Sequence, residues 1–222
     1  MVILILIVLS IGPPLALAYY VYKKDTHEKE PVGLVVKSFV FGALSVIPVS
    51  LVEGIVSVRF ENNIFVYSVI GIALVEEGFK FLFLKRYFFS NREFNEPFDG
   101  IVYAVMVSLG FATIENIFYV FGSYEEGVSV GIIRMFTAVP LHAVCGVIMG
   151  YFVGLAKFKF ADQQRGLLLG GLSLAVIVHG IYDYFIFAGN YLTFSILALI
   201  IAIIFSAKAI KSHQNNSPFR KD

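Results

Sequence analysis

The chain has 222 residues, of which 58% are hydrophobic and only 15% are charged, and its mean hydropathy is +0.82. A water-soluble domain of this size cannot bury so much apolar surface, so the composition predicts a polytopic membrane protein. The formal net charge is +1, and the basic residues are spread over short connections instead of forming a patch, which gives no sign of nucleic-acid binding.

Polar residues divide the chain into about seven apolar runs, each close to the roughly 20 residues that a helix needs to cross the hydrocarbon core. No basic residue precedes the first run, whereas Lys23 and Lys24 follow it, which is the reverse of the charge order in a signal peptide. We therefore expect a retained first helix that bends near Pro13 and Pro14. The expected spans are residues 2–22, 32–58, 64–86, 98–122, 129–156, 166–188 and 191–210. This pattern predicts an all-α transmembrane helix bundle.

The basic residues indicate how the bundle is oriented, because they fall on alternate connections. They are Lys23, Lys24, Lys85, Arg86, Arg92, Lys157, Lys159, Arg165, Lys208, Lys211, Arg220 and Lys221. The other connections are acidic or neutral apart from Arg59. By the positive-inside rule, we expect the amino terminus outside and the carboxyl terminus in the cytoplasm. We expect a single membrane domain over residues 1–211, with a short cytoplasmic tail at 212–222.

Two adjacent glutamates, Glu76 and Glu77, interrupt the third apolar run. A charged side chain at the centre of a bilayer costs about 2.5 to 3.5 kcal/mol on insertion scales, so such residues indicate a functional site. The third to sixth spans hold further polar residues, namely Lys80, Glu115, Asn116, His142, His179 and Asp183. At 1.5 Å per residue, one polar residue from each of these four spans lies roughly 12 to 20 Å below the outer end of its helix. They are Glu76, Glu115, His142 and His179. We therefore expect one site between the outer leaflet and the midplane.

Spacing within the helices predicts specific contacts, because residues four apart share a face. Glu76 and Lys80 have this spacing, so the ammonium can neutralise or orient one carboxylate. His179 and Asp183 also have it, which suits an imidazole oriented by a carboxylate. Glu77 points about 100° away from Glu76. We expect the two glutamates to have different roles, one in a reaction and one in holding helices or Lys80.

Each polar residue also has a structural interpretation. Glu115 and Asn116, taken singly, are as readily explained as interhelical hydrogen-bond partners. Gly146 and Gly150 form a small-x-x-x-small pair that favours close helix packing, and Pro140 is expected to break or kink its helix.

Three other polar residues are interpreted outside the predicted cluster. We expect Arg134 to pair with Glu125 or Glu126 in preference to polarising a substrate carbonyl. Glu53 is expected to reach the outer interface, and Asp99 to cap a helix on the cytoplasmic side.

Glutamates and histidines are residue types that hydrolyse peptide bonds with water. They do so by binding zinc through two histidines and a carboxylate, or by activating water directly. The sequence lacks a His-Glu-x-x-His motif, and both schemes stay open. A proton-coupled transporter or channel is an alternative, since such residues also build proton relays, although the chain shows no internal repeat. A non-catalytic membrane scaffold is a third interpretation.

Five ordered motifs resemble those of the PrsW intramembrane proteases. They are Glu76-Glu77-Gly78-Phe79-Lys80, Asp99-Gly100-Ile101-Val102-Tyr103, the segment from Gly110 to Tyr119, His142 leading into Gly146 and Gly150-Tyr151, and His179-Gly180-Ile181-Tyr182-Asp183. The resemblance extends from the stretch at Asp25 to Pro31 as far as Asp183, which is nearly the whole chain.

The resemblance implies a multi-pass protease of the bacterial plasma membrane. Its expected partner is a membrane-spanning anti-sigma factor, whose site-1 cleavage leads to release of a sigma factor. The family's essential residues correspond to Glu76, Glu77 and His179, and His142 and Asp183 match its remaining site motifs. We expect Glu76 to activate water, His142 and His179 to bind zinc or stabilise the oxyanion, and Asp183 to orient His179. The expected zinc ligands are Glu76, His142 and His179, with Lys80, Glu115 and Asn116 in support.

The PrsW proteases are related to the type II CAAX prenyl endopeptidases, from which this chain departs at two positions. In those enzymes three residues usually stand between the paired glutamates and an arginine, and the last motif ends in asparagine. Here Lys80 stands closer to the pair of glutamates than that arginine does, and Asp183 takes the place of the asparagine. These departures favour the PrsW branch. The oligomeric state does not follow from the sequence.

Overall fold

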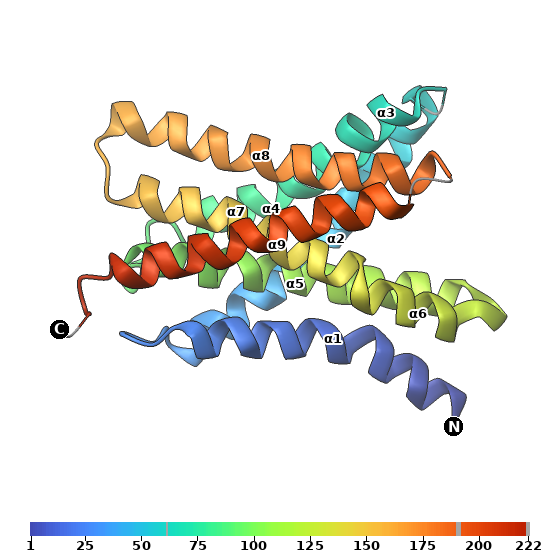
Figure 1. Ribbon diagram of the computed structural model, residues 1–222, viewed down its shortest axis with the longest axis horizontal. Helices are drawn as coiled ribbons and strands as arrows, with labels where there is room; N and C mark the ends of the chain where they lie inside the picture. Colours follow the sequence, from blue (N-terminus) through green and yellow to red (C-terminus); the bar gives the residue numbers. More distant parts are fainter. Residues whose placement is uncertain (61, 190–191, 221–222) are drawn as a thin grey trace.

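The computed structural model describes residues 1–60, 62–189 and 192–220, and every regular element among them is helical. The elements are α1 (Val2–Lys24), α2 (Val32–Phe60), α3 (Ile64–Val66), the π-helix η1 (Tyr67–Ala73), α4 (Leu74–Tyr87), α5 (Pro97–Gly122), the 3₁₀ helix η2 (Tyr124–Glu126), α6 (Gly127–Phe136), α7 (Ala138–Lys157), α8 (Ala161–Phe187) and α9 (Leu192–Asn215). Figure 1 shows them as one bundle. The predicted all-α transmembrane fold is confirmed. Some positions of the predictions lie outside the described residues. They are residues 61 and 190 in predicted connections, residue 191 in the last predicted span, and Lys221 in the predicted tail.

Six helical stretches of the described chain are long and apolar enough to cross a membrane. The predicted third span is the exception, because α3, η1 and α4 divide it into three short pieces that follow one another without a break. Pro13 and Pro14 lie inside an uninterrupted α1. The break near Pro140 falls three residues earlier, at Thr137, which separates α6 from α7. Pro140 then lies in the first turn of α7, where a missing backbone N–H is tolerated.

Helix α5 forms the centre of the bundle and packs closely against α2 and α7. A Cβ atom on Gly110 would lie 1.9 Å from the carbonyl oxygen of Phe39 in α2, and one on Gly150 would lie 2.4 Å from that of Gly100 in α5. Only glycine allows backbones to approach this closely. The predicted packing role of Gly150 is thus confirmed, and Gly146 also faces α5, with Val105 Cα 2.9 Å from its would-be Cβ.

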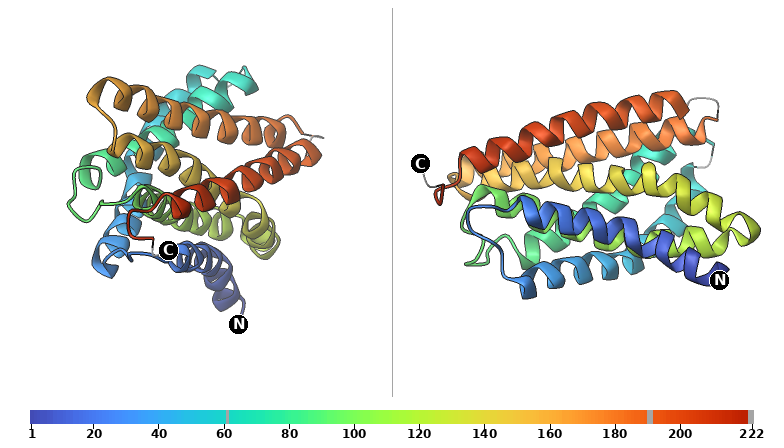
Figure 2. Two further views of the ribbon diagram at one scale, coloured as in Figure 1. Left: turned by 60° about the vertical axis from the view of Figure 1, so that its left-hand side comes forward. Right: turned by 60° about the horizontal axis from the view of Figure 1, so that its bottom comes forward.

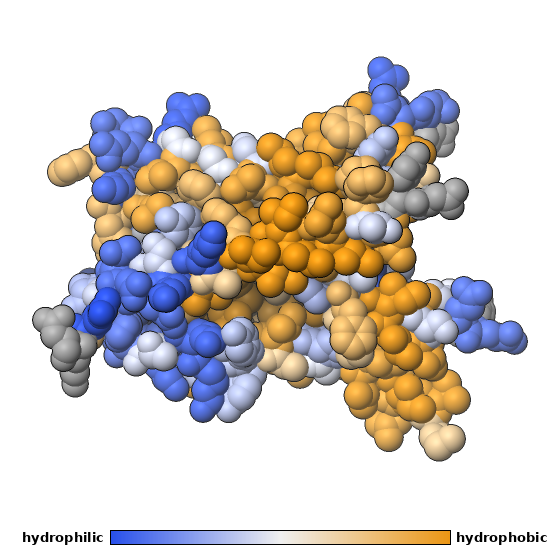
Figure 3. Space-filling model, in the orientation of Figure 1, coloured by the Kyte–Doolittle hydropathy of each residue, from blue (hydrophilic) through white to orange (hydrophobic). Residues whose placement is uncertain are grey.

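The two ends of the bundle differ in which connections they carry. The amino terminus, α3, α6, the last turn of α8 and the first turn of α9 lie at one end, whereas the last turn of α9 and the α1–α2 and α7–α8 connections lie at the other (Figures 1 and 2). On the face shown in Figure 3, hydrophobic residues cover the middle, and hydrophilic residues lie toward both ends, most of them near the end of α9. This arrangement agrees with the alternation of basic connections. We call the first end the N-terminal end and the second the C-terminal end.

Candidate active site

The two glutamates lie in the first turn of α4, directly after the π-helix η1. A π-turn holds more residues than an α-turn, so it rotates the helix that follows, and such turns are frequent at functional sites. Gly180 of α8 packs against this segment, since a Cβ on Gly180 would lie 2.9 Å from Val69 Cα. The π-helix therefore brings the start of α4 and the middle of α8 together.

Lys80 connects three residues of the cluster. Its Nζ donates hydrogen bonds to Glu76 Oε2 at 2.9 Å and to Glu77 Oε1 at 2.8 Å, and it lies 3.1 Å from His142 Nδ1. The lysine is completely buried, and its Nζ is 4.1 Å from the centre of the Phe111 ring. The predicted contact with Glu76 is therefore present, and the single positive charge of Lys80 is shared between the two glutamates.

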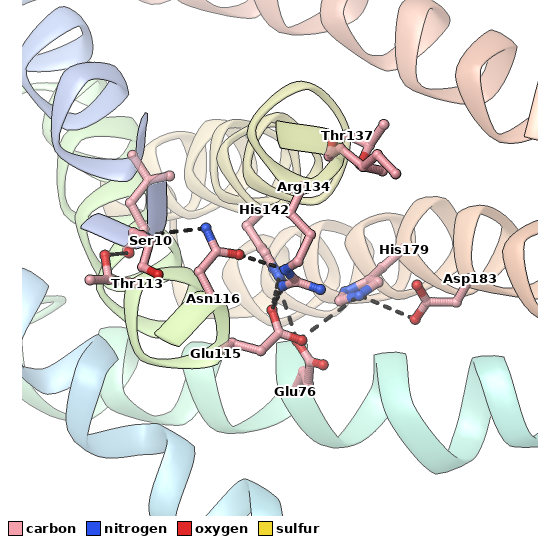
Figure 4. Close-up of polar contacts among 12 residues, drawn as sticks. Ser10, Glu76, Thr113, Glu115, Asn116, Arg134, Thr137, His142, His179 and Asp183 are labelled. Atoms are coloured by element: carbon pink, nitrogen blue, oxygen red, sulfur yellow. Dashed lines mark hydrogen bonds and ion pairs between the residues drawn. The ribbon is translucent and has the colours of Figure 1, made fainter. Parts of the chain in front are cut away.

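His142 is held through both ring nitrogens. An ammonium group has only donors, so His142 Nδ1 accepts from Lys80 and its Nε2 carries the proton. That Nε2 lies 2.8 Å from Glu115 Oε2, which accepts its hydrogen bond (Figure 4). Glu115 thus fixes the tautomer and the orientation of His142.

His179 lies between carboxylates. Its Nδ1 is 2.9 Å from Glu77 Oε1, and its Nε2 is 3.3 Å from Asp183 Oδ2 and 4.0 Å from Glu76 Oε2. The contact with Asp183 agrees with the predicted one-turn spacing (Figure 4). The ring centres of His142 and His179 are 5.2 Å apart. The predicted convergence of the third to sixth spans is therefore observed.

The interpretation of Arg134 as a partner of Glu125 or Glu126 was wrong. Its Nη2 lies 2.7 Å from Glu115 Oε2, and its Nε lies 2.7 Å from Asn116 Oδ1. The break at Thr137 lets α6 pack along α5, so that Arg134 meets the last turns of α5. Arg134 and His142 therefore both contact Glu115. The spacing of these residues in the sequence did not indicate this link.

A cavity of about 440 Å³ adjoins the cluster. Glu76, His142, His179 and Asp183 line it, whereas Glu77 and Lys80 are not among its lining residues. The cavity also contacts residues near the N-terminal end of the bundle, including Tyr67. One glutamate therefore faces the cavity and the other faces the protein.

Glu53 of α2 also lines this cavity, contrary to its interpretation as an interfacial residue. Its Oε1 is buried and has no hydrogen-bond partner among the described residues. Glu53 is the only acidic residue of α2, which was the available signal, but its position toward the end of the helix favoured the wrong interpretation.

The cluster offers the donor types that zinc uses. One ligand atom from each of Glu76, Glu77, His142 and His179 lies within 4.8 Å of the others. Two imidazoles and a carboxylate form a common catalytic zinc set. The donors therefore fit zinc by type and proximity. Lys80 contacts three of the four, so its ammonium would have to withdraw if a second cation joined them.

Comparisons with known proteins decide the family. A family model described as PrsW family intramembrane metalloprotease matches residues 30–208. The chain belongs to this family. It is 36% identical to a protein named Protease PrsW from Geobacillus kaustophilus over 218 residues, which cover 94% of this chain and 93% of that protein. No solved structure matches the chain.

Two further PrsW relatives show the same extent of similarity. Protease PrsW of Bacillus subtilis is 38% identical over 185 residues, which cover 81% of each chain. Protease PrsW of Clostridioides difficile is 32% identical over 208 residues, which cover 90% of this chain and 85% of that protein. This PrsW-family chain is accordingly an intramembrane protease and a multi-pass membrane protein.

Proposed function

We propose that this protease performs site-1 cleavage of a single-pass anti-sigma factor, at a peptide bond near the outer membrane face. The observation that carries the proposal is the wall of the 440 Å³ cavity, where a carboxylate, Glu76, stands beside two imidazoles, His142 and His179. A cavity of this size admits an extended peptide segment and water. Its lining continues toward the N-terminal end, which the charge pattern predicts to be outside.

Glu76 is the proposed general base, because it faces the cavity and Glu77 does not. Its carboxylate takes a proton from water while the water oxygen attacks the carbonyl carbon of the scissile bond. The same proton then passes to the leaving amine nitrogen as the carbon–nitrogen bond breaks. Glu77 holds Lys80 and His179 in place, at 2.8 and 2.9 Å.

His179 is the better placed of the two histidines to stabilise the developing oxyanion. Both ring nitrogens of His142 are engaged at 2.8 and 3.1 Å, by Glu115 and Lys80. The Nε2 of His179 has a longer contact, 3.3 Å from Asp183, and can turn its donor toward substrate. Donors aimed at developing charge in a water-poor site contribute strongly to catalysis.

Zinc is compatible with this arrangement. Glu76, His142 and His179 would hold the ion, which when bound polarises a carbonyl and lowers the pKa of water. Proton transfer by Glu76 or its neighbour Glu77 is needed in either case.

The test is cleavage of a purified single-pass anti-sigma factor in reconstituted vesicles. We expect Glu76→Gln to lower the rate by about 10²- to 10⁴-fold, the usual contribution of a general base. His179→Ala should also lose activity. The matched control is Glu126→Gln, because Glu126 is an exposed glutamate of η2. Its rate should equal that of the wild type.

Three outcomes would overturn the proposal. Wild-type cleavage by Glu76→Gln would remove Glu76 from the chemistry. Intact substrate with the wild-type protein, together with a proton flux that both variants abolish, would indicate a transporter. Loss of the folded state in both variants, seen by size-exclusion chromatography and thermal melting, would indicate a structural cluster. A zinc-selective chelator, followed by zinc addition, separates the metal-dependent mechanism from direct water activation.

A further inference from the structure

A second group of carboxyl groups lies near the C-terminal end of the bundle, away from the candidate active site. Glu28 and Glu30 belong to the α1–α2 connection, and Asp99 belongs to the first turn of α5. Each offers one carboxylate oxygen, and these three oxygens lie within 4.8 Å of one another. The group joins two segments that are about 70 residues apart in the sequence, and helix packing by itself does not require like charges to meet there.

Each buried member uses one oxygen for the protein and leaves the other without a partner. Asp99 Oδ2 accepts hydrogen bonds from the backbone N–H groups of Asn95 and Glu96 at 2.7 and 2.8 Å. Tyr103 donates its hydroxyl proton to Glu30 Oε2. The opposite oxygens are buried and have no hydrogen-bond partner among the described residues; they are Glu30 Oε1, Asp99 Oδ1 and, from the third member, Glu28 Oε2.

The burial of these side chains is nearly complete. Glu30 is 1% exposed and Asp99 is 0% exposed, while Glu28 is half-buried and gives access from solvent. Asp25, just before this connection, is also 0% exposed and leaves its Oδ1 unpartnered. Buried polar oxygens are nearly always satisfied in folded proteins. Glu30 and Asp99 can hydrogen-bond to each other only by sharing a proton, so these oxygens need another partner whenever both groups are ionised.

No side-chain nitrogen of a lysine, arginine or histidine among the described residues lies within 4.0 Å of these carboxylate oxygens, and the charge of Lys157 acts on Asp99 only from a greater distance. In residues 1–60, 62–189 and 192–220, the ion pairs within 4.0 Å involve neither Glu28, Glu30 nor Asp99. Carboxylates in such a site share protons or bind a cation.

We propose that Glu28, Glu30 and Asp99 bind a hard divalent cation, Mg²⁺ or Ca²⁺. All the donors are oxygens, which hard cations prefer, and the group contains no histidine or cysteine that would select a softer metal. Ca²⁺ binds oxygen at about 2.3 to 2.6 Å, so oxygens on opposite sides of one ion stand up to about 5 Å apart. The 4.8 Å limit within the group meets this condition.

The cation would fasten the α1–α2 connection to the start of α5. Asp99 already forms a capping box with Glu96, so it is held rigidly at the helix terminus. The ion therefore stabilises the position of α5, the central helix. Glu115 lies 16 residues further along α5, about 24 Å away at 1.5 Å per residue, so this site does not depend on the proposed catalytic mechanism.

Tb³⁺ luminescence in the full-length, detergent-solubilised protein tests the proposal. Tb³⁺ replaces Ca²⁺ at oxygen sites and emits when a nearby tyrosine absorbs light. The chain has no tryptophan, and Tyr103 contacts Glu30 directly. We expect saturable emission that Ca²⁺ or Mg²⁺ displaces, with the better competitor identifying the preferred ion.

Variants locate the bound ion. Glu30→Gln and Asp99→Asn should weaken Tb³⁺ binding at least about 10-fold, since each removes one charged ligand. Tyr103→Phe should lose emission while Ca²⁺ still raises the melting temperature. The matched control is Asp162→Asn, because Asp162 is an exposed aspartate in the first turn of α8. Its binding should equal that of the wild type.

Glu28→Gln keeps the test decisive where a buried variant fails to fold, because Glu28 is only half-buried. Weaker binding in this variant supports the site. Unchanged Tb³⁺ emission in Glu28→Gln, or a wild-type melting temperature that neither Ca²⁺ nor Mg²⁺ raises, would overturn it and leave shared protons as the partner of these carboxyls. Neither result bears on peptide cleavage, so failure here is distinct from failure of the proposed protease function.

Discussion

The bundle contains two groups of buried carboxylates, and they differ in how their charge is balanced. Around Glu76 and Glu77 the protein supplies its own cation, Lys80, which is 0% exposed and within 2.9 Å of both. Around Glu30 and Asp99 it supplies none within 4.0 Å among the described residues. Glu30 and Asp99 are as buried as Glu76 and Glu77, so burial alone does not distinguish the proposed catalytic group from the proposed cation-binding one. The source of the positive charge does.

This difference has a mechanistic consequence. A covalently attached ammonium holds its carboxylates in one geometry at all times, which suits a base that must face water in a fixed position. A group without an attached cation depends on the solution for its charge balance. Its stability then varies with ion concentration.

The largest effect is expected from removing the internal cation. Lys80→Met leaves Glu76 and Glu77 buried without a counter-charge, and breaking a buried ion pair in this way typically costs about 3 to 5 kcal/mol. We expect a lower melting temperature and loss of cleavage in vesicles.

The double variant Lys80→Met/Glu77→Gln is the control for this prediction. It removes one of the two unbalanced charges, so it should regain part of the lost stability. If Lys80→Met melts at the wild-type temperature, or if the double variant is less stable than the single one, the ammonium does not hold the cluster.

The converse change gives the carboxylates around Glu30 and Asp99 an attached cation, as Lys80 is for Glu76 and Glu77. Glu28→Lys places an ammonium on a half-buried position beside Glu30 and Asp99. A ligand at 100 times its dissociation constant adds about 2.7 kcal/mol to stability. We expect this gain to vanish in Glu28→Lys, while the stability without added Ca²⁺ or Mg²⁺ rises toward that of the cation-loaded wild type.

Thermal melting with and without divalent cation measures the effect of Glu28→Lys. Asp162→Lys introduces the same charge at an exposed aspartate and serves as the control. A cation-dependent shift in Glu28→Lys equal to that of the wild type would contradict the comparison.

Helix packing holds the residues around Glu76 and Glu77 in place, in addition to charge. A substitution at Gly180 tests the contribution of packing. A Cβ at Gly180 would lie 2.8 Å from Val69 Cγ2 and 2.9 Å from Val69 Cα, so Gly180→Ala pushes α8 away from the π-helix. Such overpacking costs about 1 to 3 kcal/mol, and it displaces the neighbouring His179 from Glu77. We expect reduced cleavage and a lower melting temperature.

Gly170→Ala is the matched control on the same helix, because nothing lies within 4 Å of its would-be Cβ. Replacing glycine by alanine in a helix usually stabilises it slightly. Equal losses of activity in the two variants would show that α8 tolerates no alanine in general, and that the contact with η1 has no special role.

Much of this architecture could be predicted from the sequence, because the bilayer demands long apolar helices and makes intramembrane charge conspicuous. The pairs one turn apart, Glu76 with Lys80 and His179 with Asp183, follow from helix geometry alone. Convergence of four helices was inferred from equal depths. These inferences depend on local periodicity and on the membrane, which are both written in the sequence.

Contacts between helices could not be predicted in the same way. Arg134 meets Glu115 because α6 and α7 are separated at Thr137, and no spacing rule encodes the direction of α6 after that break. The π-helix η1 left no clear signal either, since its residues are compatible with an ordinary α-helix. The acidic group at Glu30 and Asp99 also escaped notice, because its members are distant in sequence and lie where charged residues are common.

The smallest effect is expected at Asp183, whose carboxylate is 3.3 Å from His179 Nε2 and whose side chain is 14% exposed. Asparagine keeps an oxygen that accepts a hydrogen bond from this nitrogen, whereas alanine does not. Loss of a group that only orients a ligand or catalytic residue usually costs about 10- to 100-fold in activity, so Asp183→Ala should fall in this range. Asp183→Asn should lose less than about 10-fold, because the orientation persists and only the charge is lost. Cleavage rates of the two variants, measured at equal amounts of folded protein, decide the matter. Equal and large losses would mean that the negative charge of Asp183 is needed, and that His179 depends on its surroundings for charge balance as well as for orientation.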